Sequence, residues 1–472
     1  MSAVPESAAA IASAVGSGEL RAVDVVQSSL SRIETLNPVF NAFTDVTADR
    51  AMAEAESVDA AIAGGADLPL AGVPFAVKNL FDIEGVVTRA GSKINLENLP
   101  ATTDATLTTK LCRAGGILMG GLHMGEYAYD FTGENAHDGN CLNPHDPGRM
   151  SGGSSSGAGS AVASGMVPVT LGSDTNGSIR VPSSFCGLFG LKPTYGRLSR
   201  HGTFPFVGSL DHLGPLARSA QDLALVFDAL QGRDISDPAQ PDRPVLSTGG
   251  ELVKGTDGLR IAVAGGYFRQ KAEPEALAAV DAVANALGVS AEIDIPEAAR
   301  ARASAYVITV AEGAALHLER ITNRPQDFDP DTRDRFLSGT MVPALWVQQA
   351  QRFRSWFRAM MRGIFEHVDA LLAPATPFSA LPSGTKTITL DGETMPARPN
   401  IGLFTQPISF IGLPVVAVPV WLEEASLPIG VQVIAPAWRE DIALRIASRL
   451  ERDGTCKAPV AAPRAELVSQ GT

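Results

Sequence analysis

Residues 149–192 read RMSGGSSSGAGSAVASGMVPVTLGSDTNGSIRVPSSFCGLFGLK, and this stretch decides the fold of the chain. Glycine and serine dominate it, but apolar runs at 166–171 and 185–191 alternate with the Gly/Ser-rich loops. A flexible linker has no reason to carry such runs. Loops rich in glycine let backbone amides approach a ligand closely. We therefore expect buried elements that present two loops, one with Ser154 and the other with Ser178.

Outside this stretch, apolar segments of strand length alternate with segments of helical periodicity. We expect strands at 70–77, 116–121, 167–171, 259–264, 368–373, 413–420 and 429–434. We expect helices at 7–37 (broken at 16–18), 51–63, 104–114, 158–165, 275–287, 300–321, 341–365 and 441–450. Strands that alternate with helices indicate an α/β protein whose sheet is covered by helices on both faces.

The whole chain, residues 1–472, is expected to form a single domain. Helices occupy about residues 1–65, and the glycine-rich core follows at about 66–231. Residues 232–256 are polar and rich in proline, glycine and aspartate, which favours a surface excursion over a hinge between domains. The second half of the same fold is expected at about 257–460.

Composition limits the classes of partner. The net charge of −13 argues against binding to nucleic acid or to an anionic membrane. The four cysteines lack CxxC spacing, so we expect a reducing, cytoplasmic environment. The first residues lack the basic region of a signal peptide, and no apolar run is long enough to span a membrane. Motifs for metals or nucleotides are absent, so we expect no cofactor.

Three polar residues end apolar strands or open glycine-rich loops: Lys78, Ser154 and Ser178. Serine is a poor nucleophile unless a base accepts its proton. No histidine has an evident triad context, whereas burial can lower the pKa of a lysine enough for it to act as a base. Ser154 would then bridge Lys78 and Ser178. The turn before Ser178 would supply backbone amides to an oxyanion hole.

This constellation resembles the amidase signature family. The resemblance extends over nearly the whole chain and rests on GVPFAVK (72–78), GGSS (152–155), GSDTNGSIR (172–180), GLKPTYG (190–196), SLDHLGP (209–215), LLAPATP (371–377), GLP (412–414) and PIGVQ (428–432). It implies a large mixed sheet and a triad in which Ser178 is the nucleophile, Ser154 the bridging serine after a cis peptide bond, and Lys78 the base. No cofactor or metal is implied.

The resemblance also assigns the neighbouring residues. The oxyanion hole would be formed by Thr175, Asn176, Gly177 and Ser178. Asp174, Arg180 and Ser155 would support the site. Two positions depart from the usual motif, because Ser156 replaces a glycine and Asn176 replaces a glycine or alanine. Neither change removes a catalytic side chain.

Asn176, together with 126–129, 196–206 and 405–414, resembles the subfamily of 1-carboxybiuret hydrolases. This implies a small ureido substrate, a small helical partner subunit similar to the C subunit of amidotransferases, and a dimer of such heterodimers. The alternatives are the glutaminase chain of a tRNA-dependent amidotransferase, an amidase of other specificity, or a non-catalytic protein on this fold.

An anionic substrate calls for an arginine, because a guanidinium binds a carboxylate through two hydrogen bonds. Arg89, Arg149 and Arg320 are the candidates, and each is equally compatible with a surface position. Tyr127 and Tyr129 either flank a planar ureido group or belong to the core.

Overall fold

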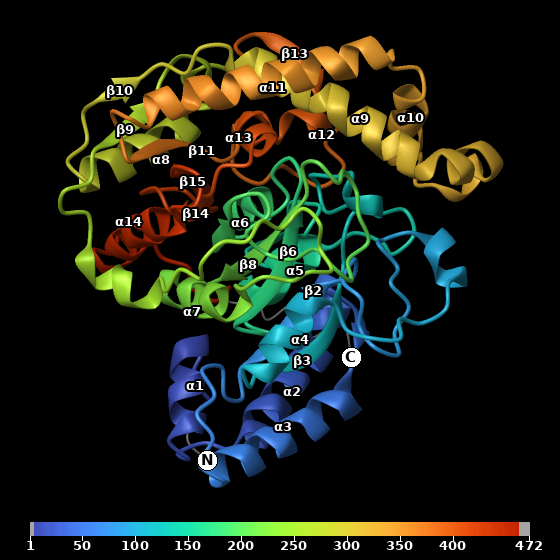
Figure 1. Ribbon diagram of the computed structural model, residues 1–472, viewed down its shortest axis with the longest axis vertical. Helices are drawn as coiled ribbons and strands as arrows, with labels where there is room; N and C mark the ends of the chain where they lie inside the picture. The colour runs from blue at the N-terminus through green and yellow to red at the C-terminus, as the bar shows by residue number, and fades with distance from the viewer. Residues whose placement is uncertain (1–3, 462–472) are drawn as a thin grey trace.

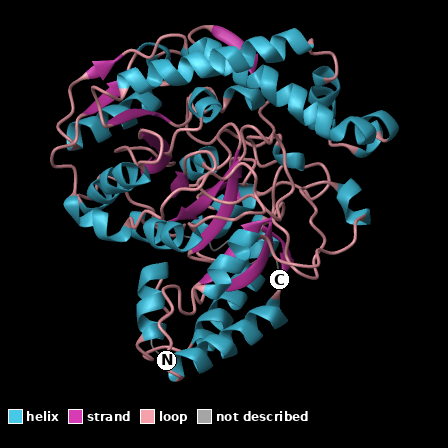
Figure 2. Ribbon diagram, in the orientation of Figure 1, coloured by secondary structure: helices cyan, strands magenta, loops and turns pink. Residues whose placement is uncertain are grey.

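The computed structural model describes residues 4–461. Within these residues, eleven strands form one sheet in the order β1-β3-β2-β6-β8-β7-β14-β15-β11-β9-β10 (Figures 1 and 2). The strands are β1 (Phe43–Val46), β2 (Pro74–Lys78), β3 (Ile117–Leu122), β6 (Val169–Asp174), β7 (Phe189–Lys192), β8 (His212–Ala217), β9 (Ile261–Ala264), β10 (Glu292–Ile293), β11 (Ala370–Pro374), β14 (Val415–Val420) and β15 (Ile429–Ile434).

The sheet is mixed. β2 runs parallel to both β3 and β6, and β9 runs parallel to β10 and β11, whereas β6, β8, β7, β14 and β15 pair antiparallel with one another in turn. Two short hairpins lie outside it, β4 (Leu142–Asn143) with β5 (Asp146–Met150) and β12 (Thr387–Leu390) with β13 (Glu393–Pro396).

The helices are α1 (Ala8–Gly16), α2 (Ala22–Phe40), α3 (Ala48–Ala63), α4 (Thr106–Arg113), α5 (Ser156–Ala163), α6 (Arg180–Phe185), α7 (Ala220–Leu230), α8 (Pro274–Ala286), α9 (Ala298–Asn323), α10 (Pro330–Gly339), α11 (Ala344–Ile364), α12 (Ala397–Asn400), α13 (Gln406–Ile411) and α14 (Glu440–Arg452). None of the helices within residues 4–461 has the length and apolarity that crossing a bilayer requires.

Helices cover both faces of the sheet. Every residue of β2, β6, β14 and β15 is buried, and strands whose side chains alternate between faces reach this state only if both faces are covered. The α/β class and the covered sheet predicted from the sequence are confirmed. At one end of the molecule α2 packs on β2 and α3 on β3, with α1 against α3 and α7, and at the other end α9 and α11 lie side by side (Figure 1).

The sequence pattern located most long elements but left the centre of the sheet incomplete. The expected helix at 300–321 is α9, and the expected strand at 167–171 is β6, which continues to Asp174. β7 and β8 were not expected, although they lie between β6 and β14. Most of the polar segment 232–256 lies outside regular structure, apart from a short 3-10 helix at Gly249–Lys254.

Candidate active site

Lys78 is the last residue of β2, and its side chain is completely buried. Its amine donates a hydrogen bond of 2.6 Å to Ser154 Oγ and one of 2.9 Å to Ser173 Oγ. The strand parallel to β2 on this side is β6, so the lysine reaches the end of β6. A lysine at the end of a strand is ordinarily exposed, and its burial here requires the two hydroxyl partners.

Burial lowers the pKa of Lys78 to about 7, although the carboxylates of Asp211, Asp174 and Asp130 oppose this shift. Desolvation disfavours the charged ammonium, and no carboxylate within residues 4–461 forms an ion pair that would restore it. At neutral pH a large fraction of the amine is therefore unprotonated. A neutral amine has a lone pair that can accept a proton.

Ser154 lies in the loop that leads into α5. The Gly153–Ser154 peptide bond is cis, as the family resemblance implies. The Ser155 hydroxyl accepts a hydrogen bond from the amide of Ser173 at 3.2 Å and donates one of 3.1 Å to its carbonyl. This side chain thus ties the Ser154 loop to the end of β6, where Ser173 contacts Lys78.

The unusual Ser156 has its own partner. His123 Nδ1 lies 2.8 Å from Ser156 Oγ, which also donates to the carbonyl of His123 at 3.3 Å. The hydroxyl that replaces the family's glycine is therefore satisfied inside the protein. This departure does not reach Lys78 or Ser154.

The loop from Thr175 to Ser178 begins where β6 ends at Asp174. Its side chains are held on two sides, because the Thr175 hydroxyl donates to Asp211 at 2.6 Å and the Asn176 amide donates to Thr309 at 3.0 Å. The structure records no acceptor within residues 4–461 for the backbone amides of 176–178. Buried amides without partners are costly, so this turn is prepared to bind an acceptor oxygen.

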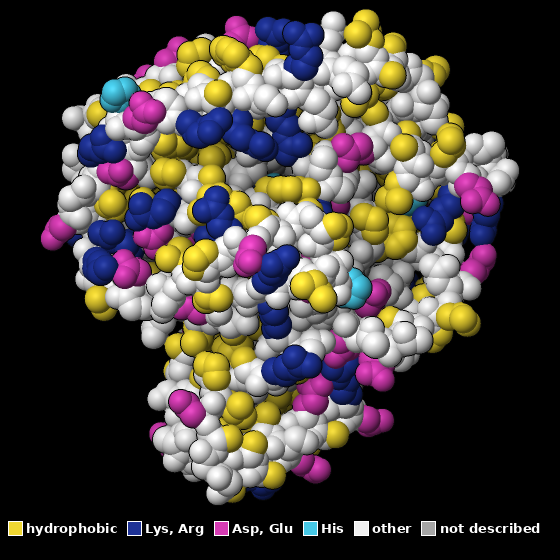
Figure 3. Space-filling model, in the orientation of Figure 1, with side chains coloured by type: hydrophobic (Ala, Val, Ile, Leu, Met, Phe, Trp, Pro, Cys, Tyr) yellow, Lys and Arg dark blue, Asp and Glu magenta, His cyan; other side chains and the backbone are white. Residues whose placement is uncertain are grey.

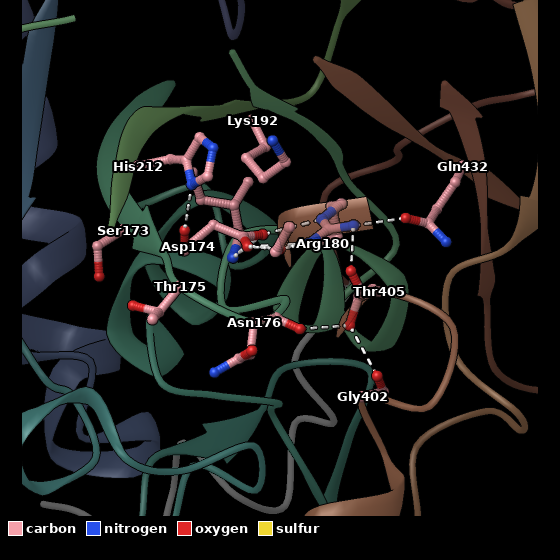
Figure 4. Close-up of polar contacts among 12 residues, drawn as sticks. Ser173, Asp174, Thr175, Asn176, Arg180, Lys192, His212, Gly402, Thr405 and Gln432 are labelled. Atoms are coloured by element: carbon pink, nitrogen blue, oxygen red, sulfur yellow. Dashed lines mark hydrogen bonds and ion pairs between the residues drawn. The ribbon is translucent and has the colours of Figure 1, made fainter. Parts of the chain in front are cut away.

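Asp174 and Arg180 form a completely buried ion pair, with 2.9 Å between Arg180 Nη2 and Asp174 Oδ1. Asp174 also accepts the amide of Ile179, so the pair closes the loop around Ser178. Burial alone would raise the pKa of Asp174, but Arg180 outweighs it and lowers the pKa below its usual range. Arg180 Nη1 also donates hydrogen bonds to the side-chain oxygen of Gln432 and to the carbonyl of Thr405 (Figure 4).

His212 and Lys192 lie on the far side of Asp174 (Figure 4). His212 Nδ1 is 3.0 Å from the carbonyl of Asp174, in a pair of residues that face each other across β6 and β8. Lys192 donates to the carbonyls of Pro193 and Leu413, and burial lowers its pKa to about 7. Both side chains support the backbone behind the loop rather than the pocket in front of it.

A narrow pocket opens in front of Ser178. It is lined by Ala128, Tyr129, Asp130, Phe131, Thr175, Asn176, Ser178, Phe206, Tyr306, Thr309, Arg335 and Gln406. A larger cavity of about 300 Å³ lies beside it, shares Ala128, Thr175 and Phe206 with it, and reaches Ser173. Ser178 thus lines the narrow pocket, whereas Ser173, the hydroxyl partner of Lys78, lines the larger cavity.

The structure brings only one of the three expected substrate-binding residues to this pocket. Tyr129 lines it, whereas Tyr127 is buried in an aromatic cluster, 4.0 Å between ring centroids from His317. Arg320 lies over Tyr127 and Phe204 in the same cluster. Neither Tyr127 nor Arg320 lines this narrow pocket, but both contact Phe204, which lines the larger cavity beside it, so their role in substrate binding stays a prediction.

The other two arginine candidates do not line this pocket either. Arg89 forms an ion pair with Asp138, and Arg149 Nε lies 3.5 Å from Asp146 Oδ2 in the β4–β5 hairpin.

Arg335 of α10 was missed by the sequence analysis. Its guanidinium carbon lies 3.4 Å from the centre of the Tyr129 ring, and Nη1 donates a 2.7 Å hydrogen bond to the Tyr129 carbonyl. No carboxylate within residues 4–461 forms an ion pair with it. No local motif marks this residue, because its position beside Ser178 results from the packing of α10 on α9.

A buried lysine that contacts Ser154 and Ser173, next to a turn whose amides have no acceptor among residues 4–461, defines the class of site that acyl transfer requires. The chain belongs to the amidase family, because the family's sequence model, described as Amidase, matches residues 24–444.

The relatives agree with this assignment. The chain is 52% identical over 451 residues to AtzE, a 1-carboxybiuret hydrolase subunit of Pseudomonas sp. (strain ADP), and the match covers 94% of this chain and 97% of that protein. It is 34% identical to the A subunit of glutamyl-tRNA(Gln) amidotransferase of Koribacter versatilis (strain Ellin345), covering 93% and 96%.

Two solved structures show the same fold. One, described as a vestigial protein complex that reveals the origins of an s-triazine catabolic enzyme, superposes with a TM-score of 0.95 at 51% identity, covering 96% of this chain and 99% of that one. An amidase superposes with a TM-score of 0.84 at 28% identity, covering 95% and 99%. The chain is an amidase signature enzyme acting on amides.

Proposed function

We propose that this enzyme hydrolyses a C–N bond through an acyl-enzyme on Ser178. The observation that carries the proposal is Lys78, an amine whose pKa is lowered by burial to about 7 and which is hydrogen-bonded to Ser154. Ser178 Oγ attacks the carbonyl carbon and passes its proton through Ser154 to Lys78. The same residues return a proton to the departing nitrogen, which leaves as ammonia. Water then attacks the ester carbonyl and passes its proton through Ser154 to Lys78. The same residues return a proton to Ser178 Oγ as the ester bond breaks, which releases the acid and the free serine.

The oxyanion of each tetrahedral intermediate binds the amides of the turn, where the N–H groups of Asn176, Gly177 and Ser178 have no acceptor within the described chain. Such donors stabilise charge that develops in the transition state, and each contributes about 3–4 kcal/mol. We assign Thr175, the first residue of the turn, to the same oxyanion hole. The Asp174–Arg180 pair and Ser155 hold the backbone from behind.

The substrate we propose is 1-carboxybiuret, the compound that the 52% identical relative is named for. Two features of the pocket support a small anionic ureido compound. Arg335 is a cation at the pocket wall without a carboxylate partner among residues 4–461. Asn176 Oδ1 and the Tyr129 hydroxyl, in the same wall, are buried polar atoms that lack hydrogen-bond partners in the part of the chain described. A carboxylate would bind the guanidinium, and ureido N–H groups would satisfy the amide oxygen.

The complex is also part of the proposal. We infer a small helical partner protein, and a dimer of the resulting heterodimers, in the cytoplasm. The superposable structure is described as a protein complex, and the 34% identical relatives are subunits. Exposed apolar and basic side chains gather along α11, including Trp346, Trp356 and Arg352, and offer a surface to such a partner (Figure 3).

The alternative, the glutaminase chain of an amidotransferase, uses the same triad but is supported by lower identity, 34% against 52%. Ammonia release distinguishes the two. The protein, alone and with a co-expressed small partner, would be given 1-carboxybiuret made in situ, biuret, allophanate, simple amides and glutamine. We expect turnover of 1-carboxybiuret that is absent in Ser178→Ala. Turnover of glutamine alone would overturn the substrate and favour the alternative.

A further inference from the structure

Thr405 lies against the turn that precedes Ser178, although it is more than two hundred residues away in the sequence. Its hydroxyl donates a 2.6 Å hydrogen bond to the carbonyl of Asn176 (Figure 4). A second contact, 3.1 Å to the carbonyl of Gly402, is longer and stays within its own segment. The Thr405 side chain is completely buried, so water does not compete for this proton.

This hydrogen bond fixes the orientation of a peptide unit. The carbonyl of Asn176 and the amide of Gly177 belong to the same planar group, and in a trans peptide they point in opposite directions. A carbonyl that is held toward Thr405 therefore directs the Gly177 N–H away from Thr405. That N–H has no acceptor within the described chain, and the neighbouring Asn176 and Ser178 line the pocket.

The contact between the two segments is tight enough to require glycine. Gly177 has a φ of +143°, and a Cβ placed on it would lie 2.2 Å from Thr405 Oγ1 and 2.9 Å from Thr405 Cβ. A glycine that adopts this φ without strain also flips its peptide easily. The turn therefore depends on an outside contact to keep one orientation.

Thr405 is the N-cap residue of α13, but its side chain does not cap the helix. An N-cap hydroxyl ordinarily accepts an amide of the first helical turn, but the Thr405 side chain makes no such bond. Its backbone is held instead, because Arg180 Nη1 donates to the Thr405 carbonyl at 3.2 Å. The hydroxyl is free to serve the turn, and the ion pair of Asp174 with Arg180 anchors both partners.

We propose that Thr405 is a positioning residue that orients the Asn176–Gly177 peptide so that the Gly177 N–H points into the oxyanion site. The proposal rests on the proposed function, because it assigns a role within the acyl-transfer chemistry of Ser178. Thr405 does not touch the substrate. It acts on the transition state, where the carbonyl oxygen becomes an anion, and should leave ground-state binding nearly unchanged.

The test compares Thr405→Val, which keeps the shape but loses the hydroxyl, with Thr405→Ser, which keeps the hydroxyl. Thr170→Val is the matched control, since this buried threonine of β6 also donates to a backbone carbonyl, that of Ala158, but outside the turn. Since losing a whole oxyanion donor costs about 100-fold or more, misorienting one should lower kcat about tenfold with KM within about twofold. Thr405→Ser should stay within about threefold of wild type.

A second readout does not depend on the physiological substrate. A fluorophosphonate reagent modifies an activated serine through an intermediate whose oxygen occupies the oxyanion site. We expect its rate of reaction with Ser178 to fall in Thr405→Val and to stay unchanged in Thr170→Val. If the Val variant does not fold, Thr405→Cys replaces it, because a thiol is a weaker donor.

Three outcomes would overturn the role of Thr405: equal activity of the Val and Ser variants, a rise in KM at constant kcat, or an equal loss in Thr170→Val. Failure of the proposed function is recognised separately. Wild-type enzyme that the reagent does not label at Ser178, or a Ser178→Ala variant that still turns substrate over, would reject the nucleophile whatever Thr405 does.

Discussion

The amine of Lys78 lies 2.6 Å from the hydroxyl oxygen of Ser154, inside a site where neither side chain is exposed to solvent. Ser173, one residue before Asp174, provides the amine with a second hydroxyl at 2.9 Å. These two contacts do not offset the loss of water around the amine, so burial disfavours the ammonium and lowers the pKa of Lys78 to about 7. The protonation state of Lys78 therefore links the chemistry of the site to pH.

The first prediction concerns the pH dependence of activity. Lys78 accepts a proton only when it is neutral, and burial lowers its pKa to about 7. Activity should thus be low below this pKa, and kcat/KM should rise with pH through an apparent pKa of about 7. The measurement is kcat/KM for ammonia release between about pH 5.5 and 9. Lys78→Arg should be inactive at every pH, because a guanidinium stays charged. A flat profile across this range would contradict the assignment.

The second prediction concerns stability. The folded protein holds Lys78 with a pKa of about 7 against an ordinary 10.5, so between these values the unfolded chain binds one more proton. Stability contributed by this residue therefore rises as pH increases from about 7 to 10.5 and is lowest near and below 7. Lys78→Met removes the effect. It should stabilise the fold at about pH 7.5, and the gain should shrink by about 2 kcal/mol at about pH 9.5.

Urea unfolding of the wild type and of Lys78→Met at both pH values measures this difference. Because each comparison is made at a single pH, titration of all other groups cancels. A stability difference that is independent of pH would show that Lys78 is not held neutral in the fold.

Residues 149–192 predicted the class of fold and the two serine loops because glycine, serine and apolar runs are local signals. The strands β7 and β8 were not predicted, because a short buried strand without alternating polar residues cannot be told from any other apolar run. Lys78, Ser154 and Ser178 could be singled out because motifs surround them.

The substrate pocket was harder to predict because it is formed by tertiary contacts. Tyr127 and Tyr129 are two residues apart, and an extended chain would place both on one side. Tyr127 and Ala128 instead have φ values of +49° and +60°. This left-handed turn could not be predicted from the sequence, because neither residue is one that favours a positive φ. It sends Tyr127 into the core and Tyr129 to the pocket. Arg335 and Thr405 come from distant segments and carry no local signature.

The third prediction concerns the Asp174–Arg180 pair, which is fully buried. Removal of one partner leaves an uncompensated buried charge, so Arg180→Met should cost about 3–5 kcal/mol of unfolding free energy. The double variant Asp174→Asn/Arg180→Met should lose less than the sum of the single variants. Arg233→Met is the control, because its partner Asp242 is exposed and such pairs contribute at most about 1 kcal/mol. Equal costs in the two single arginine variants would contradict the structural role.

The fourth prediction concerns substrate charge. Arg335 stacks on Tyr129 and has no carboxylate partner in the described part of the chain, so a substrate carboxylate should supply one. A hydrogen bond to a charged group contributes about 1.5–3 kcal/mol, so Arg335→Gln should lower kcat/KM for 1-carboxybiuret about 10- to 100-fold. Most of the loss should be in KM, since the carboxylate is bound equally before and during the reaction. Turnover of an uncharged amide should change little.

Arg333→Gln on the same helix is the matched control, because Arg333 pairs with the exposed Asp334 and does not line the pocket. Arg335→Lys should be intermediate, since an ammonium keeps the charge but not the two-pronged geometry. If Arg335→Gln reduced turnover of charged and uncharged substrates alike, the guanidinium would be holding Tyr129 in place and not binding a carboxylate. If Arg333→Gln caused the same loss, the effect would belong to the general field of α10, because both variants remove one positive charge from it.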